Sequence, residues 1–162
     1  MSKTLSHQTQ AKAEELLKRY PGHPEAALLP VLHLAEEDFG VIDAEAEKAV
    51  AELCKTSQVR VHRVWTFYHM YARKPRGKYH FRVCHNISCT LLGAEDIITL
   101  LLKEFGLESE GASEDGLFSL ERVECLGACG GAPSLLVNEE LYENVTEEKL
   151  KKLIRDFKSG EK

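Results

Sequence analysis

Apolar side chains recur every three or four positions through the first 74 residues of the chain, which is the period of an amphipathic helix. The segments with this period are residues 7–20, 25–39, 44–54 and 58–68. Asp43 is a suitable N-cap for the third helix and Thr56 or Ser57 for the fourth, whereas Pro30 predicts a kink or break within the second. We therefore expect a helical bundle over residues 1–74.

The period changes after the basic segment 73–77, which we interpret as a linker. After this segment, alternating or short runs of apolar side chains predict strands. Apolar side chains at helical spacing predict two helices, and Thr146 caps the second. The expected strands are 79–84, 117–124, 134–137 and 141–142, and the expected helices are 93–105 and 147–157. The acidic, Gly- and Ser-containing segment 106–116 predicts a solvated loop. Two helices around a small mixed sheet are typical of a thioredoxin-like α/β domain, here over residues 78–158, so the fold class is α+β.

Composition and charge exclude several classes of function. The chain has 162 residues, 43% of them hydrophobic, which suits one domain or two small ones. Its net charge is −5, which argues against binding to nucleic acid or to an anionic membrane. The apolar runs are shorter than the roughly 20 residues of a membrane helix, and the N-terminus is too polar for a secretory signal. We therefore expect a soluble, cytoplasmic protein.

Five cysteines point to metal or redox chemistry, because a disulfide framework is not expected in a reducing compartment. Four residues separate Cys84 from Cys89, and three separate Cys125 from Cys129. Each pair lies just after a predicted strand, so one edge of the sheet would bring the four thiols together. We expect the first pair to converge through a loop and the second through a glycine-rich turn. Cys54 stands apart on a predicted helix and is interpreted as a buried small apolar residue.

The cysteine spacing is compatible with more than one kind of site. A [2Fe–2S] cluster takes two thiolates per iron, and zinc takes two pairs with similar spacing. Unliganded or redox-active thiols are a third possibility. A Rieske centre is disfavoured, because His85 directly follows Cys84 and the second pair has no histidine nearby.

Longer motifs add a resemblance to a known family. The segment Asp115-Gly-Leu-Phe-Ser119, followed after five residues by Cys125-Leu-Gly-Ala-Cys129-Gly-Gly-Ala-Pro133, resembles the signature of the 24-kDa-type [2Fe–2S] subunit of respiratory NADH:quinone oxidoreductase (complex I). Blocks at 30–40, 61–68, 83–89 and 142–146 are similar to the same family, and the resemblance spans about residues 23 to 157. Glu36 and His85 depart from its usual pattern, and a histidine beside the cluster would perturb its potential.

The resemblance implies a helical domain followed by a thioredoxin-like domain that holds one binuclear cluster. Carried over to this chain, Cys84 and Cys89 would ligate one iron, and Cys125 and Cys129 the other. The implied partner is a flavoprotein subunit that carries FMN, the NADH site and a [4Fe–4S] cluster. The implied function is single-electron exchange with that FMN, within a larger complex peripheral to the inner membrane.

The chain itself lacks a Gly-rich phosphate-binding fingerprint, so we expect it to bind neither NADH nor flavin. It would be a non-catalytic electron carrier within an oxidoreductase, without activity as an isolated chain. We also expect the helical half to present a partner surface that includes Leu28, Leu29, Val31 and Trp65.

Four alternatives remain from the sequence. One is the equivalent subunit of a soluble NAD-linked hydrogenase or formate dehydrogenase, which resembles the same family. Another is a free-standing thioredoxin-like ferredoxin, although such ferredoxins lack the helical half. The others are a zinc-stabilised interaction module and a dithiol enzyme, the latter disfavoured because the sequence has no Cys-x-x-Cys motif.

Overall fold

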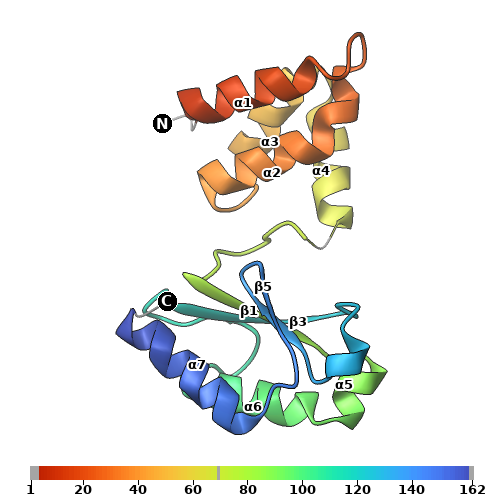
Figure 1. Cartoon of the computed structure of the whole chain (residues 1–162). Coiled ribbons are helices and arrows are strands. Elements are labelled where there is room, and N and C mark those ends of the chain that lie inside the picture. Colours follow the sequence, from red (N-terminus) through yellow and green to blue (C-terminus); the bar gives the residue numbers. More distant parts are fainter. Residues whose placement is uncertain (1–3, 69, 161–162) are drawn as a thin grey trace. The chain divides into compact units, whose positions relative to one another are not determined.

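The computed structural model describes residues 4–68 and 70–160. It divides the chain into two compact units, Met1–Pro75 and Arg76–Lys162 (Figure 1). Among the described residues, no helix combines the length and the apolar character needed to cross a bilayer.

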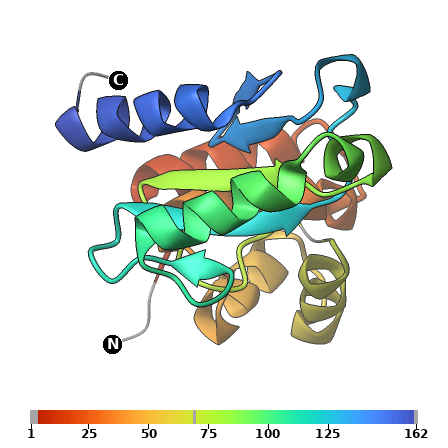
Figure 2. The same cartoon turned by 90° about the horizontal axis from the view of Figure 1, so that it is seen from below.

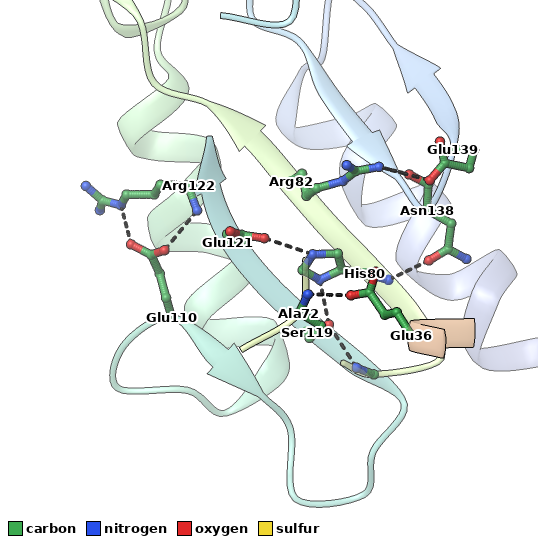
Figure 3. A network of polar contacts seen from close by, with 11 residues as sticks. Glu36, Ala72, His80, Arg82, Glu110, Ser119, Glu121, Arg122, Asn138 and Glu139 are labelled. Carbon is green, nitrogen blue, oxygen red and sulfur yellow. Dashed lines mark hydrogen bonds and ion pairs between the residues drawn. The ribbon is translucent and has the colours of Figure 1, made fainter. Parts of the chain in front are cut away.

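The first unit is helical, as the sequence predicts. Its elements are α1 (His7–Leu17), the 3₁₀ helix η1 (Pro24–Ala27), α2 (Leu28–Phe39), α3 (Ala44–Leu53) and α4 (Gln58–Phe67). The Asp43 carboxylate accepts hydrogen bonds from the first backbone N–H groups of α3, and Ser57 rather than Thr56 caps α4. Glu36, near the end of α2, accepts a hydrogen bond from the Ala72 N–H group (Figure 3).

The expected break at Pro30 is wrong. Pro30 is the third residue of α2 and lies in its first turn, where backbone N–H groups have no partner within the helix. The helical geometry instead changes from 3₁₀ to α between Ala27 and Leu28, before the proline.

Apolar side chains that we expected to face a partner belong to the core of the first unit. Leu28 is 5% exposed and Val31 is fully buried, while Leu29 and Trp65 are half-buried against the same core. A bundle of short helices has little interior, so it needs these side chains to close around Leu32, Val50 and Val61.

A buried carboxylate joins α3 to α4. Glu47 lies in the core of the bundle, where its Oε1 accepts a 2.6 Å hydrogen bond from Trp65 Nε1 and lies 2.6 Å from His62 Nδ1. Gln58 Nε2 donates to Glu47 Oε2 at 3.1 Å. Burial alone would raise the pKa of Glu47, but the hydrogen bonds from Trp65, His62 and Gln58 hold it below its ordinary value.

The second unit is a mixed sheet with helices, and the thioredoxin-like arrangement predicted from the sequence is confirmed. Its elements are β1 (Tyr79–Cys84), α5 (Ile87–Leu91), α6 (Ala94–Phe105), β2 (Gly111–Ala112), β3 (Phe118–Val123), the 3₁₀ helix η2 (Cys129–Gly131), β4 (Leu135–Val137), β5 (Glu140–Tyr142) and α7 (Glu147–Ser159). The strand order is β2-β3-β1-β4-β5, with β1 and β3 parallel and the other pairs antiparallel.

Two elements of this unit differ from the sequence-based expectation. Gly111 and Ala112, within the expected loop 106–116, form the edge strand β2 against β3. Cys89 lies on the short helix α5 rather than in a loop. Both elements are too short to produce a period that a sequence pattern can reveal.

The two faces of the sheet differ in character because successive side chains of a strand point to opposite sides. Phe81, Phe118 and Leu135 lie on the face covered by α6 and α7, where they form the main core of the unit (Figures 1 and 2). Phe105 of α6 stacks on Phe118 with the ring centroids 4.5 Å apart, and Phe157 of α7 packs edge-on against Phe81.

The opposite face carries a polar network at its centre (Figure 3). His80 Nδ1 lies 2.8 Å from Ser119 Oγ, and His80 Nε2 lies 3.1 Å from Glu121 Oε2. The Gly77 N–H group donates to Ser119 Oγ at 2.9 Å, which attaches the segment before β1 to β3. A Cβ atom at Gly77 would lie 2.4 Å from the Phe118 carbonyl carbon, so this close approach requires glycine.

Candidate metal centre

Two parallel strands end at the edge of the sheet where the cysteines lie. β1 ends at Cys84, which is in register with Val123, the last residue of β3. Cys125 follows two residues after Val123. Because the carboxyl ends of neighbouring parallel strands meet at one edge, the segments that follow β1 and β3 begin side by side.

The first cysteine pair is buried. Cys84 is 2% exposed and Cys89 is 1% exposed, and the two residues pack in the same small cluster. Asn86 directs the chain between them, because its side chain accepts a hydrogen bond from the Ile87 N–H group and begins α5. The short helix thereby places Cys89 back against the end of β1.

The second pair lies on the surface, with Cys125 in the segment after β3 and Cys129 at the start of η2. Cys125 and Cys129 are exposed, and their sulfur atoms lie 3.7 Å apart. Gly127 has a φ of 77°, which favours glycine, and its N–H group donates to Cys125 Sγ at 3.4 Å. Two sulfur atoms bound to one tetrahedral metal at about 2.3 Å would lie about 3.8 Å apart, so this pair is spaced for a shared metal.

Several contacts connect the two pairs. The Leu126 backbone lowers the pKa of Cys84, and the Ser88 side chain lowers the pKa of Cys129, whereas the charge of Cys89 raises it. Leu126 and Ala132 also pack against the buried first pair. The structure therefore brings all four cysteines of the second unit to one edge of the sheet, as expected from their positions after strands.

The thiols are arranged as two pairs rather than around one point. In the part of the chain that the structure describes, no three His, Cys, Asp or Glu side chains are gathered closely enough to hold a single ion. Cys54 belongs to a different environment: it is fully buried in the core of the helical unit, and burial raises its pKa to about 11.

The electrostatic environment differs between the thiols. Burial raises the pKa of Cys84. Burial also opposes ionisation of Cys89, but hydrogen bonds from the Ser134 hydroxyl, the Ser134 backbone and the Cys84 thiol together lower the pKa of Cys89. The hydrogen bond with Cys125 and the charge of that neighbour raise the pKa of Cys129. At Cys89 the donors therefore outweigh burial, whereas at Cys84 burial outweighs them.

Ser134 is a site residue that the sequence pattern did not reveal. It is 1% exposed, and its Oγ lies 3.6 Å from Cys89 Sγ. In the sequence it is only the first residue of a predicted strand, and its role depends on a contact across 45 positions. Ser88, whose side chain lowers the pKa of Cys129, was missed for the same reason. His85 lies toward solvent, with its Nε2 3.8 Å from Glu124 Oε1.

These residues fit a binuclear iron–sulfur cluster. Such a cluster takes two thiolates on each iron, and the chain supplies two pairs with N–H and O–H donors beside the sulfur atoms. The same metal–sulfur distances also suit zinc, but a single zinc ion needs its ligands around one point, whereas the thiols of the described residues form two separate pairs.

Comparisons with known proteins give the family context. The family model described as thioredoxin-like [2Fe–2S] ferredoxin matches residues 13–158. The NADH-quinone oxidoreductase subunit designated E in Rickettsia felis is 40% identical over 147 residues, which cover 90% of this chain and 88% of the relative. The corresponding protein of Rickettsia conorii is 39% identical over 144 residues, which cover 88% of this chain and 86% of the relative.

Solved structures show a similar fold. A crystal structure of an NAD⁺-reducing [NiFe]-hydrogenase in the H₂-reduced state matches 82% of this chain with a TM-score of 0.73 and 19% identity. This chain spans only 22% of that hydrogenase chain, and at this identity the likeness concerns the fold alone.

Proposed function

Since this chain belongs to the thioredoxin-like [2Fe–2S] ferredoxin family, we propose that it is an electron-transfer subunit of an NADH:quinone oxidoreductase (complex I). The observation that carries the proposal is the edge of the sheet where Cys84, Cys89, Cys125 and Cys129 meet. The chain that holds this edge is 40% identical, along 90% of its length, to a subunit of such an oxidoreductase.

Each cysteine pair would hold one iron. Cys84 and Cys89 would bind the first from inside the domain, and Cys125 and Cys129 would bind the second at the surface. When bound, the [2Fe–2S] cluster accepts and passes on one electron at a time. Leu126 and Ala132 pack against the inner pair and exclude water from it, while the outer pair is accessible to a partner protein.

The protein's other task at this site is to stabilise negative charge. Four thiolates would concentrate negative charge at one edge of the domain, and the one electron that a bound cluster accepts would increase this charge. The Gly127 N–H group donates to Cys125 Sγ, the Ser134 hydroxyl lies 3.6 Å from Cys89 Sγ, and the Leu126 backbone lowers the pKa of Cys84. Such donors lower the energy of the reduced state more than that of the oxidised state, because they interact with the larger negative charge.

The proposed partner is a flavoprotein subunit that carries FMN, the NADH site and a [4Fe–4S] cluster. The chain would exchange single electrons with that FMN and would act as a non-catalytic carrier. Its position in the cell would be cytoplasmic and peripheral to the inner membrane, through the complex. The absence of a Gly-rich nucleotide fingerprint from the sequence supports this division of labour.

A second candidate is the equivalent subunit of an NAD-linked hydrogenase, favoured by the similarity of fold to an NAD⁺-reducing [NiFe]-hydrogenase. The subunits that co-purify with the native chain distinguish the two. Quinone reduction by the purified complex supports the first, and hydrogen oxidation supports the second.

Metal analysis tests the cluster itself. Anaerobically purified protein should be reddish-brown, hold about two irons and about two acid-labile sulfides per chain, and give a binuclear EPR signal after reduction. A colourless protein with one zinc per chain would instead identify the site as the zinc-stabilised alternative.

A further inference from the structure

One continuous stretch of the chain has a charge opposite to that of the whole. Residues 53–94 contain no Asp or Glu and eight Lys or Arg, whereas the net charge of the chain is −5. In the first unit these basic residues lie on α4 and on the segments that flank it. They are Lys55, Arg60, Arg63, Arg73 and Lys74.

The helix α4 has one face in the core and one face in solvent. Val61 is fully buried, and Val64 and Trp65 pack against the core. On the outer side, Val59 is 68% exposed and Phe67 is 77% exposed. We use the term α4 surface for Val59, Arg60, Arg63 and Phe67, which together line a shallow groove of about 510 Å³.

The arginines of the α4 surface lack carboxylate partners. Among the described residues, no Asp or Glu forms an ion pair with Arg60 or Arg63, although Arg60 acts electrostatically on Glu25 from a longer range. Arg122 in the other unit is different, because it pairs with Glu95 at 3.2 Å and with Glu110 at 3.6 Å. Arg73 adds positive charge at the end of α4, where its Nη2 donates to the Thr66 carbonyl at 2.6 Å.

We propose that the α4 surface is a docking site for an acidic segment of the partner flavoprotein subunit. Carboxylates of that segment would pair with Arg60 and Arg63, and an apolar side chain between them would enter the groove beside Phe67. This inference rests on the proposed function, which supplies the partner subunit.

The chemistry of these side chains supports this occupant. An arginine guanidinium presents N–H groups in a planar fork that matches a carboxylate, so two unpaired arginines favour an acidic segment. Exposed aromatic side chains next to arginines are typical of residues that dominate protein–protein binding. An anionic membrane would also attract two arginines. The net charge of the chain, −5, disfavours that occupant because it repels an anionic membrane.

The test measures the affinity of the full-length, cluster-containing chain for the purified flavoprotein subunit. The variant Arg60→Glu/Arg63→Glu reverses both charges, and Arg60→Gln/Arg63→Gln removes them with less perturbation of the helix. Phe67→Ser removes the apolar contact alone. Lys12→Glu/Arg19→Glu is the matched control, because it makes the same change in net charge at exposed positions on and after α1.

We expect the charge reversal to weaken binding about tenfold or more and to make the remaining affinity less sensitive to salt. Phe67→Ser and the Gln variant should weaken it less, the control should bind like the wild type, and the EPR signal should be unchanged throughout. Equal affinity of the wild type and the Arg60→Glu/Arg63→Glu variant would overturn the docking site and leave the proposed function intact. So would equal weakening by the control.

Two further outcomes are informative. If the wild-type chain with its cluster does not bind the flavoprotein, the proposed partner is wrong, and the docking site fails with it. Vesicles of phosphatidylcholine and phosphatidylserine test the membrane alternative. The inference would be contradicted if Arg60→Glu/Arg63→Glu abolished binding to these vesicles but left the affinity for the flavoprotein at the wild-type value. The α4 surface would then be assigned to a membrane.

Discussion

The Sγ atom of Cys89 lies 3.6 Å from the Oγ atom of Ser134, and both residues are almost completely buried. The hydroxyl belongs to the residue before β4, and the thiol belongs to α5. The contact therefore joins the start of β4 to the short helix that follows β1. Through this contact, the Ser134 side chain can act on the first cysteine pair, Cys84 and Cys89.

We predict that Ser134→Ala lowers the midpoint potential of the cluster. The hydroxyl stabilises the more negative, reduced state, and a hydrogen bond worth roughly 1 kcal/mol corresponds to about 40 mV for one electron. The measurement is a redox titration followed by EPR. Ser119→Ala is the control, because Ser119 is also buried but contacts His80 rather than a thiol. An unchanged potential in Ser134→Ala would show that the hydroxyl does not act on the cluster.

Substitution of any of the four proposed ligands by serine should lose or distort the cluster. Serine replaces a thiolate by a hydroxyl, which is a poor ligand for iron in this setting. Iron and sulfide content and the EPR signal report the result for Cys84, Cys89, Cys125 and Cys129. Cys54→Ser is the control and should keep the cluster, because Cys54 lies in the core of the helical unit. Loss of the cluster in that variant alone would reverse the ligand assignment.

The isolated chain should be reduced by dithionite but not by NADH. NADH gives up two electrons together as a hydride, whereas a [2Fe–2S] cluster accepts one electron, so a flavin must mediate, and the chain has no Gly-rich nucleotide site in its sequence. Bleaching of the visible absorption follows the reaction. Addition of the flavoprotein subunit should then permit reduction by NADH. Rapid bleaching by NADH in a flavin-free preparation would reveal a nucleotide site in this chain.

Glu47 should stabilise the helical unit in a pH-dependent manner. Glu47→Ala leaves the Trp65 indole without its acceptor, and we expect a loss of roughly 2 kcal/mol in the free energy of unfolding. Trp65 is the single tryptophan of the chain, so its fluorescence follows unfolding directly. Glu52→Ala, at an exposed position of the same helix, is the control and should change stability little.

The pH dependence has a defined sign. The folded-state pKa of Glu47 is lower than its ordinary value of 4.5, so its ionised form stabilises the fold above that pH. This contribution should disappear as the pH falls below about 4.5 and through the lowered pKa. The difference in unfolding free energy between the wild type and Glu47→Gln should therefore shrink over this range. A difference that grows on acidification would contradict the assignment.

The second unit should fold and hold its cluster without the first. It contains its own core, with Phe81 and Phe118 at the centre, and all four proposed ligands. A fragment that begins at Arg76 should retain the absorption and EPR signal of the cluster but bind the flavoprotein more weakly than the full chain. Equal affinities of the fragment and the full chain would limit the helical unit to a stabilising role.

Much of the fold follows from local patterns. The helices α3 and α7 begin after Asp43 and Thr146, as their side chains predict, because capping acts over only a few residues. β1 follows an alternating run for a similarly local reason. By contrast, β2 consists of two residues that become a strand only by pairing with β3. The prediction of a break at Pro30 is wrong because the effect of a proline depends on how far it lies from the start of the helix.

The sequence by itself determined which four cysteines are candidates, since cysteine spacing and position after predicted strands are local properties, and the resemblance to a known family implies them as ligands. Only the tertiary structure decided that Cys84 and Cys89 are buried while Cys125 and Cys129 face solvent. It also decided that Ser134 reaches Cys89. Burial and such contacts arise from packing between segments 45 residues apart, and a pattern that extends over a few residues contains no information about them.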